Sequence, residues 1–279
     1  MPELQTLMTG LVFGESPRWH DSHLYCFDIA TNEVFLINLA GNVEVITREP
    51  AGIASIGFLD GALLVAGRDG RIQRRQADGS FVTQADLASI SDKPWNDMVV
   101  DGRGNTYIGN IGFDFPGGEF RPGIVALVSP AGSARQVADG TAFANGMVVT
   151  PDNSTLIVAE TYAHRLTAFD IAVDGSLSNR RRWADLPGSF PDGISLDAEG
   201  AIWYADVPGK RCVRVAQGGR VLQAIELDRG CFACALGGEL GATLFMMVAQ
   251  YPPTSWGPDA PRTGQVLTTQ APAPRAGWP

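Results

Sequence analysis

The 279-residue sequence lacks several features that would place it in a large class of proteins at once. It has no block of lysines or arginines, and its formal net charge is −9. Because nucleic acids and anionic membranes bind basic faces, we expect neither as a partner. It has no run of about 18 apolar residues, so no transmembrane helix is expected. Its first residues show neither a basic start nor a long apolar stretch, so we expect a cytoplasmic location.

Cysteine and histidine are scarce, which limits the kinds of disulfide and metal sites. Cys26, Cys212, Cys231 and Cys234 do not suffice for a disulfide framework in a chain of this length. Cys231 and Cys234 form a lone C-x-x-C pair, but a zinc site would need a second pair or nearby histidines, and the three histidines are scattered. We therefore expect the cysteines to be buried structural thiols.

Common catalytic motifs are also absent. There is no G-x-S-x-G nucleophile elbow and no H-E-x-x-H zinc motif. The stretch GRDGR at 67–71 indicates a turn rather than a phosphate-binding loop, and the short basic run at 180–182 is expected to be a solvated loop edge. No cofactor other than a metal ion is implied.

What the chain does contain is a regular alternation of short apolar segments and tight turns. Strand-like segments at 22–30, 61–67, 104–111, 154–161 and 200–207 each follow a turn rich in Asp, Asn or Gly. A third and usually a fourth strand follow each of them. The pattern predicts an all-β protein, a six-bladed β-propeller with four-stranded antiparallel blades. We expect one domain over 1–270, closed by pairing an early strand with a late one, and a loosely attached tail at 271–279.

One position recurs in all six repeats, five residues before the first turn of each unit. The six residues are Glu15, Ser55, Asn96, Asn145, Asp192 and Cys234, at intervals of 40, 41, 49, 47 and 42 residues. In a propeller, residues of equal phase point to the same place. Two carboxylates and two carboxamides would meet there, which favours a site for a hard cation. The alternative is that each side chain merely caps a strand or a turn.

Four motifs around these positions together resemble the gluconolactonase/regucalcin (senescence-marker-protein) family of six-bladed propellers. They are GESPRW, WNDMVVDGRG, ANGMVVTPDNSTLIVAET and PDGISLDAEGAIWYADV, and the resemblance covers about 12–270. It implies lactone opening with one divalent metal ion (Ca, Mg, Mn or Zn) bound by Glu15, Asn145 and Asp192. It also implies that Asp192 is the catalytic general base and that Asn96 contacts the substrate or a metal-bound water.

One departure from the family pattern concerns the substrate. Sugar-lactone members often carry an Arg two residues before the counterpart of Asn96, whereas this chain has Pro94. Because proline has no side-chain hydrogen-bonding group, a less polar lactone or ester becomes as plausible as a sugar lactone. Trp95, Phe113 and Tyr162 are candidate substrate contacts, although Trp95 could equally belong to the core.

Two long loops, 111–123 and 250–264, are rich in Pro, Gly and aromatic residues, including Phe115, Phe120, Tyr251 and Trp256. They are expected over the binding face, or else each packs only on its own blade. The partner is expected to be a small lactone or ester, and the oligomeric state stays open. Two other functions are compatible with the same residues. One is a propeller that binds a metal or ligand without turnover, and the other is an esterase or phosphotriesterase.

Overall fold

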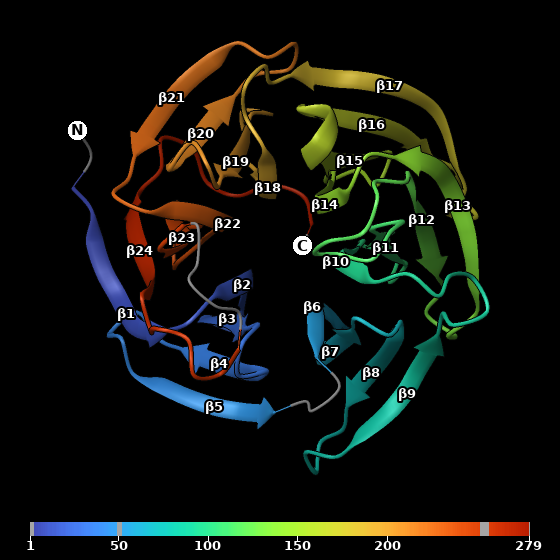
Figure 1. Cartoon of the computed structure of the whole chain (residues 1–279), viewed down its shortest axis with the longest axis horizontal. Helices are drawn as coiled ribbons and strands as arrows, with labels where there is room; N and C mark the ends of the chain where they lie inside the picture. The colour runs from blue at the N-terminus through green and yellow to red at the C-terminus, as the bar shows by residue number, and fades with distance from the viewer. Residues whose placement is uncertain (1–2, 49–51, 252–256, 279) are drawn as a thin grey trace. The chain divides into compact units, whose positions relative to one another are not determined.

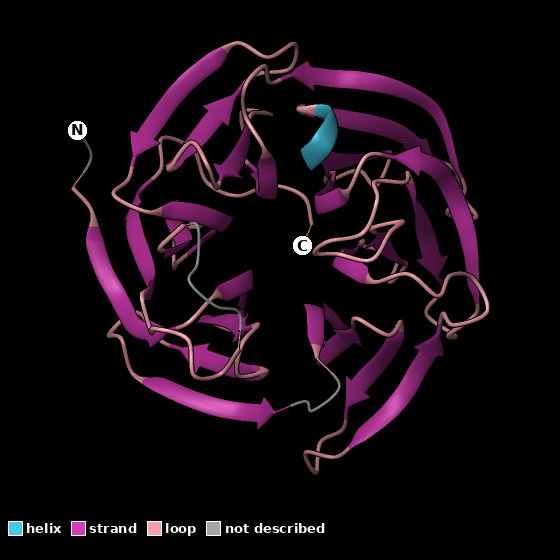
Figure 2. Cartoon of the chain, viewed as in Figure 1, coloured by secondary structure: helices cyan, strands magenta, loops and turns pink. Residues whose placement is uncertain are grey.

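The computed structural model describes residues 3–48, 52–251 and 257–278. Nearly all regular structure in these ranges is β-strand, and the one helical element there is a single 3-10 turn, η1 (Thr161–Ala163) (Figure 2). No helix within these ranges has the length and apolar character needed to cross a bilayer. The strands form six four-stranded antiparallel sheets, and the chain is an all-β, six-bladed β-propeller, as predicted.

Three of the sheets belong to a first compact unit, residues 1–50 and 184–276. Its strands are β1 (Gln5–Leu11), β2 (Gly14–His20), β3 (His23–Asp28), β4 (Glu33–Ile37), β5 (Val43–Arg48), β18 (Pro191–Leu196), β19 (Ile202–Asp206), β20 (Arg211–Val215), β21 (Val221–Glu226), β22 (Gly230–Gly237), β23 (Thr243–Ala249) and β24 (Gly264–Gln270). The N-terminal β1 lies beside β24 in one sheet, with Gln5 opposite Thr268 (Figure 1). The predicted pairing of an early strand with a late one is thereby confirmed.

The other three sheets belong to a second unit, residues 51–183 and 277–279. Its strands are β6 (Ile53–Leu59), β7 (Ala62–Gly67), β8 (Arg71–Arg75), β9 (Phe81–Asp86), β10 (Trp95–Val100), β11 (Thr106–Asn110), β12 (Gly123–Val128), β13 (Ala134–Thr141), β14 (Ala144–Val149), β15 (Thr155–Glu160), β16 (Arg165–Ile171) and β17 (Leu177–Asp185). Each sheet takes its four strands in chain order. The prediction of one domain over 1–270 stays a prediction.

The turns between first and second strands follow from their sequence. Asp60 and Gly61 both have positive φ, 49° and 76°, and close the β6–β7 hairpin, whose last pair is Leu59 with Ala62. Asp-Gly favours this two-residue turn because both positions need left-handed backbone. Elsewhere an aspartate organises a longer turn: the Asp101 side chain accepts hydrogen bonds from the backbone N–H groups of residues 103 and 105, each at 2.8 Å.

Apolar side chains fill the spaces between neighbouring sheets of each unit. In the second unit, Trp95, Met98 and Ile108 form one core cluster with residues of β7, and each is fully buried. In the first unit, Trp203 and Leu244 lie in a cluster that also holds three of the cysteines. All four cysteines are free and buried, which confirms the expected structural thiols.

The C-terminal segment differs from expectation. Ala271 and Ala273 are only 4% and 3% exposed. Within the first unit, the N–H of Ala276 donates to the carbonyl of Leu196 at 2.9 Å. Within the second unit, Trp278 and Val149 exchange both backbone hydrogen bonds. The prediction of a loose tail is therefore wrong, because backbone pairing with strand ends holds this Pro- and Gly-rich segment.

Candidate active site

The six phase-matched residues all lie in an edge strand of their own sheet, the strand that begins each repeat and is called its first strand. Glu15 is in β2, Ser55 in β6, Asn96 in β10, Asn145 in β14, Asp192 in β18 and Cys234 in β22. In every one of these strands the pairing with the following strand shifts by one residue at or near that position. The shift is a β-bulge, which leaves an extra residue unpaired and re-aims the local side chains. The repeat therefore carries a bulge at the candidate site.

The bulge in β18 accounts for the Asp-Gly pair of the PDGI motif. In β18, Pro191 pairs with Asp206 and Ile194 with Tyr204, so two residues, Asp192 and Gly193, stand where β19 has one. Gly193 also meets the neighbouring strand: a Cβ there would lie 2.6 Å from the Cβ of Ala233 in β22. The Asp-Gly pair thus combines a re-aimed carboxylate with a position where no side chain fits.

In the first unit, the carboxylates of Glu15 and Asp192 both contribute to the raised pKa of one buried thiol, that of Cys231. Glu15 and Asp192 are half-buried, and the strands that carry them, β2 and β18, both contact β22. Burial is the main cause that raises the pKa of Cys231 in β22, and the charges of Asp192 and Glu15 raise it further. The first unit therefore brings two of the three expected metal ligands to one region. Among the described residues, no group of three or more His, Cys, Asp or Glu side chains is arranged to hold a metal ion.

In the second unit, one amide side chain, that of Asn96, binds the backbone of the residue that precedes the other, Asn145. Asn145 is 8% exposed, and its Nδ2 donates to Oγ1 of Thr161 in η1 at 3.2 Å. Asn96 donates through Nδ2 to the carbonyl of Ala144, also at 3.2 Å. In both residues the amide nitrogen is bound to the protein, which directs the amide oxygen elsewhere. An amide oxygen is the part of asparagine that binds hard cations or accepts a hydrogen bond.

Two of the six phase residues are buried and bound to a neighbouring first strand. Ser55 is fully buried, and its hydroxyl donates to Oδ1 of Asp97 at 2.5 Å and accepts from the N–H of Met98 at 3.1 Å. Cys234 is 2% exposed, and its thiol lies 3.6 Å from the carbonyl of Gly193. For Ser55 and Cys234, the structure therefore agrees with the alternative that the side chain supports the strands and does not bind a cation. Asp97 is a contact that the sequence analysis did not single out, although it follows Asn96 directly.

A second set of polar residues was not predicted at all. Asp28, Glu160 and Asp206 end the second strands β3, β15 and β19, and all three are fully buried. Each accepts a backbone N–H from the segment that enters the preceding first strand: from Val12 at 2.7 Å, from Ala142 at 2.8 Å and from Phe190 at 3.1 Å. These carboxylates hold the segments that lead into Glu15, Asn145 and Asp192. Their recurrence 13 to 15 residues after the phase position was a usable sequence signal.

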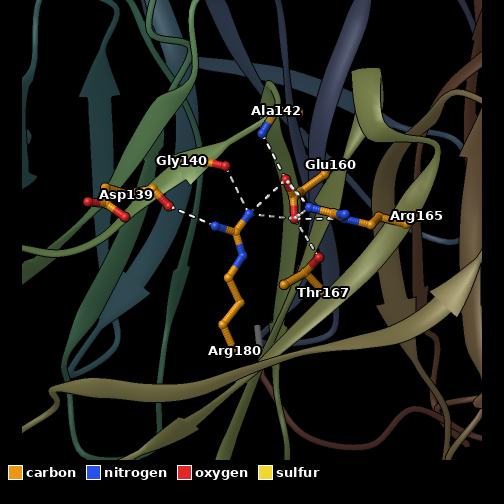
Figure 3. A network of polar contacts seen from close by, with 7 residues as sticks. All are labelled: Asp139, Gly140, Ala142, Glu160, Arg165, Thr167 and Arg180. Atoms are coloured by element: carbon orange, nitrogen blue, oxygen red, sulfur yellow. Dashed lines mark hydrogen bonds and ion pairs between the residues drawn. The ribbon is translucent and has the colours of Figure 1, made fainter.

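Glu160 is the most heavily bonded of the three (Figure 3). Arg165 and Arg180 each donate to its Oε1 at 3.0 Å, and the hydroxyl of Thr167 donates as well. Arg180 also donates to the carbonyls of residues 139 and 140, at 3.0 and 2.9 Å, just before the N–H of Ala142 that Glu160 accepts. Burial alone would raise the pKa of Glu160, but these hydrogen bonds and charges lower it below its usual value.

The expectation for the basic run 180–182 is therefore wrong for its first two residues. Arg180 and Arg181 lie in β17, the outermost strand of its sheet. Arg180 reaches the buried Glu160, and Arg181 pairs with Asp170 at 2.6 Å. Three consecutive arginines look like a solvated loop, but here two consecutive residues of an outer strand, while partly exposed, reach carboxylates on β15 and β16 of the same sheet.

An aromatic group adjoins the two amides of the second unit. It consists of Phe113, Phe115 and Phe120 from the loop between β11 and β12, Phe143 before β14, and Tyr162 in η1. The rings of Phe143 and Tyr162 stack at 5.0 Å, and that of Phe115 meets Phe143 at 5.0 Å. Phe120 and Tyr162 are 46% and 41% exposed. Tyr162 directly follows Thr161, which binds Asn145. The aromatic group therefore has an exposed surface close to Asn145, one of the expected metal-binding residues.

Three further aromatic candidates are placed differently. The ring of Trp95 has no exposed surface and lies in the core between the sheets β6–β9 and β10–β13, so the core interpretation describes it. Tyr251 lies in the first unit, where its ring meets Phe232 at 6.3 Å. Trp256 lies outside the described residues.

Comparison with known proteins gives matches over most of the chain. The family model described as SMP-30/Gluconolactonase/LRE-like region matches residues 13–250. A pentonolactonase of Haloferax volcanii is 29% identical over 248 residues, which cover 78% of this chain and 81% of that protein. Regucalcin of Gallus gallus is 26% identical over 240 residues, 81% and 79% of the two chains. The solved structure of a calcium-binding regucalcin of Agrobacterium tumefaciens has a TM-score of 0.83 at 20% identity, covers 99% and 95%, and shows the same fold.

Proposed function

Because the chain belongs to the SMP-30/gluconolactonase/LRE-like family, we propose that it is a divalent-metal-dependent lactonase that opens a cyclic ester to a hydroxy acid. The observation that carries this proposal is the recurrence of Glu15, Asn145 and Asp192 at one phase of the repeat, inside the matched region. The pentonolactonase relative supports a lactone as the substrate class. The description of the Agrobacterium tumefaciens regucalcin as a calcium-binding protein supports a divalent cation.

The chemistry of the three side chains suits a hard cation. Glu15 and Asp192 supply two carboxylates and Asn145 an amide oxygen, which are ligands of Ca²⁺, Mg²⁺ and Mn²⁺, while Zn²⁺ accepts carboxylates together with water. The strands that carry Glu15 and Asp192 both contact β22, and carboxylates that lie close together repel each other unless a cation or a proton compensates them. The hydrogen bond to Thr161 holds the amide nitrogen of Asn145 and so leaves its oxygen to face the ligand.

The proposed reaction is the addition of water to the lactone carbonyl. A cation held by Glu15, Asn145 and Asp192 would supply Lewis-acid polarisation of the carbonyl oxygen. Asp192 is the general base: a carboxylate oxygen accepts a proton from the attacking water, whose oxygen bonds to the carbonyl carbon. The bond from that carbon to the ring oxygen then breaks, and the ring oxygen takes the proton back from the Asp192 carboxyl and becomes the alcohol of the hydroxy acid, which restores the carboxylate. Asn96 orients substrate or water through its amide oxygen, since its nitrogen is held by Ala144.

We further propose that the substrate is less polar than a sugar lactone. Pro94 stands where a side chain that binds sugar hydroxyls is common in the family, and proline cannot provide such a contact. Phe113 and Tyr162 belong to the aromatic group, whose exposed rings offer apolar surface near Asn145. Trp95 would act only through the core that supports β10, because its ring is fully buried.

The test is a pH-stat panel of aliphatic lactones, sugar lactones, aryl esters and phosphotriesters, run with and without a chelator. We expect metal-dependent opening of lactones, with Asp192→Asn lowering kcat/KM by about 10²- to 10⁴-fold. Asp21→Asn is the matched control, because Asp21 is 82% exposed and its φ of 44° suits asparagine. Wild-type activity in Asp192→Asn would exclude this residue as the base. A purified protein that contains a divalent metal but hydrolyses nothing in the panel would be a binding propeller without turnover.

A further inference from the structure

One cationic side chain near the two amides has no anionic partner among the residues that the structure describes. Arg68 directly follows β7, its side chain is half-buried, and its Nη2 donates to the carbonyl of Phe115 at 3.3 Å. Within the described ranges, no ion pair involves Arg68, whereas Arg180, Arg211 and Arg214 each pair with a fully buried carboxylate. Burial lowers the pKa of Arg68. A guanidinium carries five N–H donors, and partial burial without a counter-charge is unfavourable.

The position of Arg68 links it to the candidate site. Its backbone carbonyl accepts the N–H of Trp95 at 3.1 Å, so it lies beside the start of β10, one residue before Asn96. The residue that its side chain contacts, Phe115, belongs to the aromatic group and meets Phe143 at 5.0 Å. Phe143 precedes Ala144, whose carbonyl binds Asn96. Arg68, the aromatic group and both amides therefore form one connected set within the second unit.

We propose that Arg68 binds a carboxylate carried by the lactone substrate, while the hydrocarbon part of that substrate lies against the aromatic group. This inference rests on the proposed lactonase function and narrows its substrate class: the ring and the chain of the substrate lack the many hydroxyl groups of a sugar lactone, and its one strongly polar group is the carboxylate. The planar guanidinium fork matches a carboxylate in a bidentate arrangement, and neighbouring aromatic rings strengthen the interaction because they exclude water. Arg68 thereby brings a recognition group to the candidate site from β7, in a chain where Pro94 supplies none.

The competing explanation is that Arg68 only anchors the loop between β11 and β12 through its hydrogen bond to Phe115. That contact is a single bond to a neutral carbonyl, which a glutamine side chain also provides. An anchor alone would affect charged and neutral substrates equally. Carboxylate recognition would affect only the charged ones, so matched substrates separate the two roles.

The experiment compares two lactones with the same ring and the same apolar chain, one ending in a carboxylate and the other in a primary amide. We expect the wild-type kcat/KM to favour the carboxylate, and Arg68→Gln to lower it for the carboxylate by about 10- to 100-fold, mainly through KM. The loss for the amide should stay within about threefold, and Arg68→Lys should be intermediate because it retains charge but not the fork. Arg71→Gln is the control: Arg71 is 60% exposed, pairs with Asp69 and should leave both values unchanged.

Equal losses for both lactones in Arg68→Gln, or no wild-type preference for the carboxylate, would overturn the inference while leaving the lactonase proposal intact. If the wild type opens neither lactone, calorimetric binding of the same two compounds decides. Tighter binding of the carboxylate that disappears in Arg68→Gln supports Arg68 as an anion-binding residue even without turnover. Equal affinity for both compounds contradicts it.

Discussion

The sheets β14–β17 and β6–β9 of the second unit share one topology but use their polar residues in opposite ways. In β14–β17, the second strand ends in the buried Glu160, which is fully balanced by arginines inside the same sheet. That network holds the backbone before β14 through the hydrogen bond from Ala142 to Glu160. The side chain of Asn145 itself makes a hydrogen bond to Thr161. The buried charges of this sheet thus support its structure, and the proposed metal ligand Asn145 is bound through its amide nitrogen alone among the described contacts.

In β6–β9 the roles are reversed. Gly67 pairs with Ile53 at the place where Glu160 pairs with Ala144 in the other sheet, so no acid ends the second strand. The phase residue Ser55 is fully buried against Asp97 and Met98. The comparison shows that one repeat position can have different contacts in different blades: Ser55 binds Asp97 and Met98 of β10, whereas Asn145 binds Thr161 and keeps its proposed role as a metal ligand.

The largest expected effect comes from removing the charge of Glu160. Glu160→Gln leaves Arg165 and Arg180 facing a neutral amide in a fully buried site, so we expect the free energy of unfolding to fall by about 3–5 kcal/mol. Urea denaturation at pH 7 measures it. The control in the same sheet is Asp170→Asn, whose 46% exposed carboxylate pairs with Arg181 and should cost at most about 1 kcal/mol. Similar losses in both variants would contradict a special role for the buried site.

The same carboxylate should give stability a dependence on acid pH. The pKa of Glu160 is lower in the folded protein than its usual value of 4.5, so the unfolded chain binds the proton more tightly. Its contribution to stability is therefore complete above about pH 4.5 and is lost as the pH falls toward the folded pKa. The difference in unfolding free energy between wild type and Glu160→Gln should shrink between about pH 5 and pH 3. A constant difference across that window would show that the lost interaction is not ionic.

A third prediction concerns the different roles of the phase residues Ser55 and Asn145. Ser55→Ala removes a buried hydroxyl from Asp97 and Met98 and should cost about 1–3 kcal/mol of stability. Asn145→Ala should cost less stability but weaken Ca²⁺ binding by at least about tenfold, because it removes a proposed ligand. Urea denaturation and calorimetric titration with Ca²⁺ give the two quantities for each variant. If Ser55→Ala weakened Ca²⁺ binding as much as Asn145→Ala, the assignment of separate roles would be wrong.

The fold could be predicted from the sequence because its signals are local. Asp-Gly and Asn-rich turns separate short apolar segments, and the segments expected at 61–67 and 154–161 correspond to β7 and β15. The stretch GRDGR was also predicted correctly as a turn, closed by a hydrogen bond from Gly70 to Gly67. The six phase residues also predicted the positions of the first strands, because each blade repeats both the sequence pattern and the strand pairing.

The rest of the site depends on contacts between distant residues, which spacing does not reveal. Whether Trp95 faces the core or a ligand depends on a bulge, and the bulge depends on pairing with β11. Whether Arg180 is solvated depends on the buried Glu160, 20 residues earlier. The lack of an ion pair at Arg68 within the described part of the chain follows from the tertiary structure, because only that structure shows which carboxylates the other arginines bind.

The smallest expected effect concerns the hydrogen bond that orients Asn145. Thr161→Val keeps the shape of the side chain but removes the hydroxyl that accepts from Asn145 Nδ2 at 3.2 Å. The amide would then rotate among several orientations, so Ca²⁺ affinity should fall by about two- to fivefold, in line with one lost neutral hydrogen bond. Thr161→Ser restores the hydroxyl and should restore the affinity, which excludes a packing effect. Unchanged affinity in Thr161→Val would mean that Asn145 is oriented by the bulge of β14 alone, and the two sheets would then differ only in where their charges lie.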